Sequence, residues 1–167
     1  RAWQTHGGNY KTTFLAITPA KHSSLNAIYY SASPHDIDAT DKREAGYCRV
    51  RVTHNNITPL GLKTIDSGAY WIYLKKTAHL QPPSIKYPLV QSYVDIFLDG
   101  CIQISNTYRL NKFKEKCITE TSDWPNTKGF WINDRIHARR PFKTPNAKNI
   151  DHLLSHHFKN YYNHPYE

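Results

Sequence analysis

Apolar and polar residues follow two different periods along the chain, and the period changes near its middle. The first half contains four short runs that are typical of β-strands, at residues 12–17, 26–30, 47–52 and 69–74. The third run alternates, whereas the fourth is almost wholly apolar or aromatic, as in a strand covered on both faces. The first half is therefore predicted to be mostly β-structure.

One helix is expected between these strands. Ser33 offers a side-chain N-cap and Pro34 suits the first helical position, so a short helix is predicted from there to about Glu44. Gly46 follows this helix and is expected to supply the left-handed residue that ends it.

The second half follows a helical period. Between residues 89 and 104, apolar residues fill the sequence except for a polar residue at every fourth position: Gln91, Asp95, Asp99 and Gln103. This pattern predicts a helix with a narrow polar stripe that is mostly buried.

Further helices are expected toward the C-terminus. A second, more exposed helix is predicted over residues 106–119 and a final amphipathic helix over 150–161, with an irregular, basic stretch at 124–145 between them. The order of elements, strands first and helices later, predicts one α+β domain that spans residues 1–167.

Composition excludes several classes of protein. The chain has 167 residues, which suits a single domain, and its 12 Tyr, 6 Phe and 4 Trp exclude a disordered chain. No stretch approaches the roughly 18 uncharged apolar residues of a membrane span, so no membrane partner is expected. The three cysteines, Cys48, Cys101 and Cys117, are odd in number and far apart, which favours three free thiols in a reducing cytoplasm.

Glu44 is the first candidate for chemistry. A carboxylate in the last turn of a helix faces the negative end of the helix dipole, and burial beside Tyr47 would raise its pKa toward the range of a general acid or base. Arg43 or Arg49 would oppose this by pairing with the carboxylate. From the residues alone, a surface ion pair is favoured over a catalytic carboxylate.

Three other groups of residues have functional and structural interpretations. Arg135, with Arg139 and Arg140 close by, suits a phosphate or nucleic acid, but no base-stacking motif accompanies it and the net charge of +9 is weak evidence. A solvated or Asp-paired loop is favoured, and nucleic acid is not the expected partner.

His152 and His156 have metal-ligand spacing without a third ligand, so no metal is expected.

The polar stripe of the buried helix leaves two interpretations open. Gln91, Asp95 and Asp99 either orient a substrate or hydrogen-bond to neighbouring loops.

Several motifs occur in one order along the chain. They read DKREAGYCRV at 41–50, PLVQSYVD at 88–95, GC at 100–101, WINDR at 131–135 and ARRP at 138–141. Together they resemble the bacterial branch of the γ-glutamylcyclotransferase family, over residues from about Trp3 to Leu154. The resemblance implies a small mixed β-barrel flanked by helices.

The resemblance also implies a reaction. The α-amine of a γ-glutamyl group attacks its own γ-carbonyl, closes 5-oxoproline and releases the attached amine or amino acid. It assigns Glu44 as the general acid/base and suggests that Tyr70, Tyr73 and Tyr47 contact the substrate. It implies a small γ-glutamyl substrate, no metal or organic cofactor and a cytoplasmic location.

One departure from the family concerns the start of the chain. Members open with a strand and a Tyr-Gly-Ser-Leu type loop, whose backbone N–H groups hold the glutamyl moiety. Neither feature occurs in these 167 residues. Because the chain also contains no Met, we expect a longer native N-terminus. Without that loop, the alternative function is a catalytically silent binding module on the same fold.

Overall fold

A computed structural model of the chain describes residues 3–5, 8–75, 80–124, 130–137 and 144–158. The chain divides into two compact units, which are described separately. The helical unit comprises residues 1–14 and 82–167, and the hairpin unit comprises residues 15–81. The prediction of a single domain stays a prediction.

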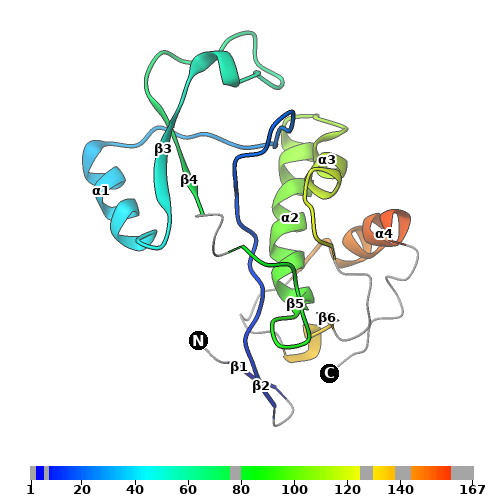
Figure 1. Cartoon of the computed structure of the whole chain (residues 1–167). Helices are drawn as coiled ribbons and strands as arrows, with labels where there is room; N and C mark the ends of the chain where they lie inside the picture. The colour runs from blue at the N-terminus through cyan, green and yellow to red at the C-terminus, as the bar shows by residue number, and fades with distance from the viewer. Residues whose placement is uncertain (1–2, 6–7, 76–79, 125–129, 138–143, 159–167) are drawn as a thin grey trace. The chain divides into compact units, whose positions relative to one another are not determined.

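The helical unit contains three helices and four short strands among its described residues (Figure 1). Its strands β1 and β2 form an antiparallel pair, and β5 and β6 form a parallel pair. In chain order the elements are β1 (Trp3–Thr5), β2 (Gly8–Tyr10), β5 (Leu89–Val90), α2 (Gln91–Thr107), α3 (Phe113–Thr119), β6 (Trp131–Ile132) and α4 (Ala147–His157).

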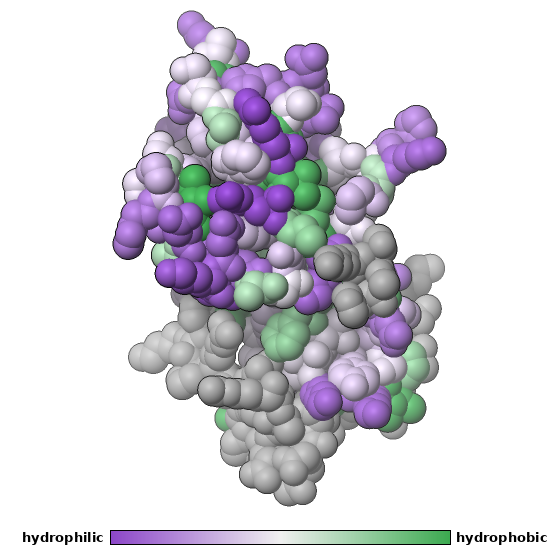
Figure 2. Space-filling model, turned by 60° about the vertical axis from the view of Figure 1, so that its left-hand side comes forward, coloured by the Kyte–Doolittle hydropathy of each residue, from purple (hydrophilic) through white to green (hydrophobic). Residues whose placement is uncertain are grey.

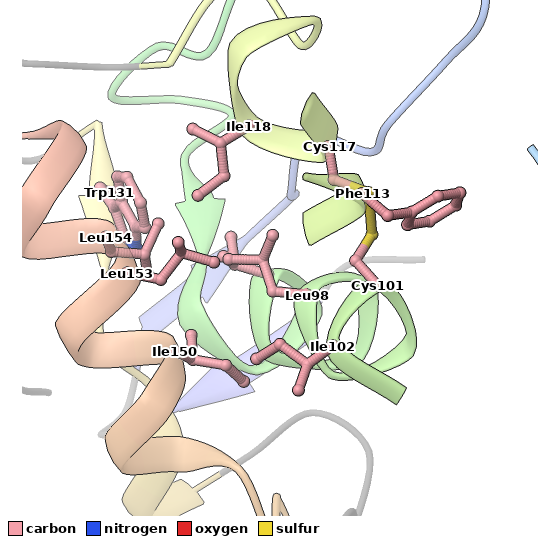
Figure 3. Packing of buried hydrophobic residues seen from close by; sticks show 11 residues of the cluster. Leu98, Cys101, Ile102, Phe113, Cys117, Ile118, Trp131, Ile150, Leu153 and Leu154 are labelled. Carbon is pink, nitrogen blue, oxygen red and sulfur yellow. A yellow bond between two sulfur atoms is a disulfide. The ribbon is translucent and has the colours of Figure 1, made fainter. Parts of the chain in front are cut away.

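The core of this unit is built around α2. Apolar side chains of α2, α3 and α4 form one cluster, which also includes the fully buried ring of Trp131 (Figure 3). In the figure Leu98 and Ile102 of α2 face Ile150 and Leu153 of α4. Each buried aliphatic side chain of this kind contributes about 1.5–3 kcal/mol to stability. The prediction of a buried helix is confirmed, with Leu89 and Val90 forming strand β5 instead of its first turn.

The second predicted helix is shorter than expected. Instead of residue 106, α3 begins at Phe113, because Arg109 adopts a left-handed conformation with φ of 54° after α2 ends. The Leu110 N–H then donates to the Ser105 carbonyl and turns the chain. Phe113, Cys117 and Ile118 enter the core, whereas Lys116 and Thr119 are exposed, so this helix is more exposed than α2, as predicted.

A disulfide joins Cys101 of α2 to Cys117 of α3 (Figure 3). The prediction of three free thiols was therefore wrong, and only Cys48 is a free cysteine. Sequence spacing did not indicate the pairing because 16 residues separate the two positions and only the α2–α3 turn brings them together. The cytoplasmic location, which relied on free thiols, stays a prediction.

The hairpin unit contains α1 (Pro34–Arg43), β3 (Cys48–Val52), a 3₁₀ turn (His54–Asn56) and β4 (Tyr70–Leu74). Its two strands pair antiparallel, with Cys48 opposite Leu74. These strands confirm the predictions for residues 47–52 and 69–74.

The caps of α1 follow the prediction at one end only. Ser33 caps the start as expected, and its hydroxyl accepts a hydrogen bond from the Asp36 N–H while the Asp36 carboxylate accepts one from the Ser33 N–H. Glu44 ends the helix, and its N–H still donates to the Thr40 carbonyl. The prediction of a left-handed Gly46 was wrong. The helix ends at Glu44, whose φ is −97°, and Gly46 is not left-handed.

The strands predicted at residues 12–17 and 26–30 do not form. The Thr13 N–H donates to the Pro88 carbonyl, whereas the Ile17 carbonyl accepts a hydrogen bond from the Lys75 N–H. Because these two bonds reach different segments, no continuous ladder develops along 12–17. The residue types at 12–17 were therefore not sufficient to specify a strand.

Among its described residues, the hairpin unit has no buried side chain. Trp71 is 44% exposed and Val50 is 40% exposed, so the prediction that residues 69–74 are covered on both faces was wrong. Figure 2 shows apolar surface between strongly hydrophilic side chains. Polar contacts therefore fix much of the arrangement of the helix and the strands in this unit, a role that a buried core has elsewhere.

The predicted α+β class is confirmed at this coarse level. The described residues form three two-stranded sheets and no closed barrel, so the mixed barrel stays a prediction. Within the described part of the chain, each helix is too short or too polar to cross a membrane.

We expect the double variant Cys101→Ala/Cys117→Ala to lower the free energy of unfolding by about 3 kcal/mol, because a cross-link over about 15 residues restricts the unfolded chain by that amount. Denaturant unfolding without reductant measures the change. Cys48→Ala is the matched control and should unfold like the original chain. Equal stability of the double variant and this control would contradict a stabilising disulfide.

Candidate functional site

Glu44 lies at the C-terminal end of α1 and its carboxylate is accessible. Its side chain is 30% exposed, and Oε1 accepts a hydrogen bond from Arg43 Nε at 3.0 Å. The expected pairing with an arginine is therefore confirmed for Arg43. Arg49, the other arginine considered, binds Asp41 instead.

Asp41 connects the same helix to the hairpin. Tyr73 of β4 donates its phenol hydrogen to Asp41 Oδ1 at 2.6 Å, and Arg49 of β3 lies 3.2 Å from Oδ2. Arg49 and Tyr73 are opposite each other in the strand register, which brings both donors to one place. Both oxygens of the carboxylate are therefore held by the hairpin.

The Arg49 guanidinium is also held by an aromatic ring. Its central carbon lies 4.9 Å from the centre of the Trp71 ring, a cation–π distance. Trp71 and Tyr73 are two residues apart on β4, so they lie on the same face of the hairpin. Trp71, Tyr73, Arg49 and Asp41 therefore form one contiguous polar-aromatic cluster, called here the α1 anchor.

Tyr47 occupies the connection between α1 and β3. The Lys75 ammonium lies 4.6 Å from the centre of its ring and donates to the Gly46 carbonyl at 3.0 Å. Tyr47 follows Glu44 by three residues, and its N–H donates to the Glu44 carbonyl at 2.8 Å.

Tyr70 belongs to a different cluster. It is three residues from Tyr73, so the two tyrosines point to opposite faces of β4. Its hydroxyl donates to the Asp66 backbone carbonyl at 2.8 Å, and its ring contacts those of Tyr29 and His54 edge-to-face. Of the residues predicted to contact a substrate, Tyr73 and Tyr47 share contacts with the α1 end, and Tyr70 does not.

Two tyrosines of this unit have a raised pKa. The hydrogen bond to Asp41, followed by partial desolvation and the Asp41 charge, raises the pKa of Tyr73, and Arg49 partly opposes this. Partial desolvation is the main cause that raises the pKa of Tyr70, with smaller contributions from Tyr29 and Asp66. Both phenols are therefore neutral hydrogen-bond donors at neutral pH.

The WINDR segment, considered above as a phosphate patch, instead holds α2 in place. Arg135 donates from Nε and Nη2 to the two oxygens of Asp95, each at 2.7 Å, and lies 2.8 Å from Asp151. Asp134 accepts a hydrogen bond from the Ser92 N–H at 2.7 Å and so caps a helix that has no side-chain cap of its own. The favoured interpretation, an Asp-paired loop, is confirmed for Arg135, and Arg139 and Arg140 lie outside the described residues.

The polar stripe of α2 is used for internal hydrogen bonds. Gln91 donates to Asp95 at 2.8 Å and accepts from the Trp131 indole N–H at 2.9 Å. Asp99 accepts from Asn146 at 2.8 Å. Of the two interpretations left open, the structural one therefore accounts for all three stripe residues.

The histidine pair lies on α4, where His152 and His156 are both exposed. Across the described ranges, no group of three His, Cys, Asp or Glu side chains is placed to hold a metal ion.

Comparison with known proteins finds no matching protein-family model, no matching curated protein and no matching solved structure. The resemblance described above therefore stays a prediction, and the function is argued below as a proposal.

Asp41 and Trp71 were missed as site residues. Asp41 stands in the first motif, and a spacing of three from Glu44 was the signal that both carboxylates share one side of a helix end. Trp71 could be found only with the strand register, which places it diagonally to Arg49.

We expect Arg135→Ala to destabilise the chain by about 3–5 kcal/mol, because it leaves the buried Asp95 carboxylate without its charge partner. Chemical denaturation measures this loss. Lys148→Ala, at an exposed position of α4, is the control and should change stability by less than about 0.5 kcal/mol. An Arg135 variant as stable as this control would contradict a role for Arg135 in holding α2.

The raised pKa of Tyr73 predicts a loss of stability at alkaline pH. The folded chain holds this proton more tightly than the unfolded chain, whose tyrosine has the ordinary pKa of 10.0. The contribution is therefore fully present below pH 10 and is lost as the pH rises through the raised pKa. Tyr73→Phe should show a weaker fall in melting temperature above pH 10 than the original chain, measured by thermal unfolding across pH. Identical pH profiles would contradict the assignment.

Proposed function

We propose that the chain is a γ-glutamylcyclotransferase-like enzyme that releases 5-oxoproline from a γ-glutamyl amine or peptide, with Glu44 as the general acid/base. The structural observation that carries this proposal is an accessible carboxylate at an anchored helix end. Glu44 is 30% exposed, and the helix that carries it is tied to the hairpin through Asp41. The order of the motifs in the sequence supports the same assignment.

The reaction needs one proton acceptor that also returns a proton. Glu44 takes a proton from the α-ammonium, and the free amine attacks the γ-carbonyl carbon to form the ring C–N bond. The bond to the attached amine then breaks as the proton on Glu44 passes to the leaving nitrogen. The second proton that the ring nitrogen loses also goes to the released amine, which leaves as an ammonium ion. No water is consumed and no redox change occurs, so the carboxylate returns to its starting state.

The finer features of the fold belong to this proposal as well. A mixed barrel would place β3 and β4 beside further strands and close the substrate site over the exposed face of the hairpin. Tyr73 and Tyr47 are the tyrosines whose contacts favour a role beside Glu44, because both lie next to the end of α1. Tyr70 is the weaker candidate, because it faces the other side of β4.

The second candidate function is a binding module that holds a γ-glutamyl ligand without turnover. The observation that favours it is the set of side chains held in fixed places at the end of α1, which would hold a ligand without proton transfer by Glu44. A γ-glutamyl ligand would then raise the melting temperature without releasing 5-oxoproline.

We expect Glu44→Gln to abolish the release of 5-oxoproline from γ-glutamyl-alanine and γ-glutamyl-methylamine while leaving the melting temperature within about 2 °C. Release is measured by mass spectrometry of the reaction mixture. Asp38→Asn is the matched control, because Asp38 is an exposed carboxylate on the same helix. Activity retained by Glu44→Gln would contradict the assignment. A ligand-induced rise in melting temperature with no release by the original chain would favour the binding module.

A further inference from the structure

We infer that Asp41 is a positioning residue that fixes Glu44 by holding the end of α1 against the β3–β4 hairpin. The catalytic consequence of this inference rests on the function proposed above. The positional part stands on the contacts of the hairpin unit alone.

The starting observation is that α1 has no apolar anchor. This helix of ten residues has no buried side chain. Helices in proteins are usually held by packing an apolar face, and an isolated helix of this length is only marginally stable in water. The position of α1 relative to the hairpin therefore depends on its polar contacts.

The strongest of these contacts converge on one carboxylate. Asp41 Oδ1 accepts the phenol hydrogen of Tyr73 at 2.6 Å, and Oδ2 lies 3.2 Å from Arg49 Nη1. The two donors come from two different strands, and the guanidinium is itself held against Trp71 at 4.9 Å. Two donors in fixed places restrict both the position and the rotation of the carboxylate.

Glu44 inherits this restriction through the helix. It follows Asp41 by three residues, a spacing that places the Cβ atoms about 5–6 Å apart on one side of a helix. The last turn is intact, because the Glu44 N–H donates to the Thr40 carbonyl at 2.8 Å. Movement of Asp41 away from the hairpin would therefore move Glu44 with it.

A contact beyond the helix limits the same movement from the other side. Lys75, which directly follows β4, donates to the Gly46 carbonyl at 3.0 Å. The segment from Asp41 to Gly46 is thus held at both ends by the hairpin. Loss of the Asp41 contacts should loosen the helix end without detaching the chain, so the variants should still fold.

The test compares Asp41→Asn and Tyr73→Phe with the control Asp38→Asn. With γ-glutamyl-alanine as substrate, the two anchor variants should lower kcat by about 10- to 100-fold, the cost of a misplaced catalytic group. KM should stay within about twofold for Asp41→Asn, because Asp41 is not among the residues proposed to contact the substrate. In a Glu44→Gln background, Asp41→Asn should have no further effect on release.

Amide hydrogen exchange supplies a readout that does not depend on activity. Exchange at residues 41–47 should be faster in both anchor variants than in the original chain and unchanged in Asp38→Asn. Unchanged exchange in both anchor variants would overturn the inference, and so would faster exchange with an unchanged kcat.

The proposed function can fail separately from this inference. If the original chain releases no 5-oxoproline, the enzyme assignment fails. The exchange comparison then still decides whether Asp41 fixes the end of α1: faster exchange supports that positional role, and unchanged exchange overturns it.

Discussion

The helical unit depends on one guanidinium placed between two carboxylates. Arg135 binds both oxygens of the buried Asp95 and also reaches Asp151, so it links α2 to α4 through the segment that follows β6. A buried carboxylate is costly unless it is paired and hydrogen-bonded. Asp95 satisfies this condition, because it also accepts a hydrogen bond from Gln91. The polar stripe of α2 can therefore stay inside the molecule, while apolar side chains fill the other sides of the helix.

The hairpin unit holds its helix and strands together without a buried core among its described residues. Its contacts are hydrogen bonds, ion pairs and ring contacts at partly exposed positions, and Asp41 is the carboxylate on which two of them converge. Contacts of this kind contribute less stability than buried ones, because water screens them. They do provide direction, since a carboxylate between two donors has few alternative positions. An aspartate thus holds neighbouring elements together in each unit: the buried Asp95 in the helical unit and the partly exposed Asp41 in the hairpin unit.

The sequence predicted these features to different extents for physical reasons. The capping of α1 by Ser33 and the helical period of α2 are local signals, and both predictions are confirmed. The residues at 12–17 carry a strand pattern, but they form no strand, because the backbone hydrogen bonds of Thr13 and Ile17 reach different segments. The disulfide of Cys101 and the pairing of Asp41 with Tyr73 depend on how distant segments meet. Such contacts cannot be read from spacing.

These differences also explain which candidate groups remain functional candidates. Arg135 and the stripe residues of α2 are used in contacts within the fold, so no bound ligand is needed to explain why these polar side chains are there. The fold does not depend on the Glu44 carboxylate in the same way. Among the contacts described, this carboxylate binds only the neighbouring, exposed Arg43. A charged group that contributes little to the fold, at a helix end held firmly by its neighbours, is free to act on another molecule. That contrast, between a fixed backbone and an available carboxylate, is the physical basis for proposing Glu44 as the catalytic group.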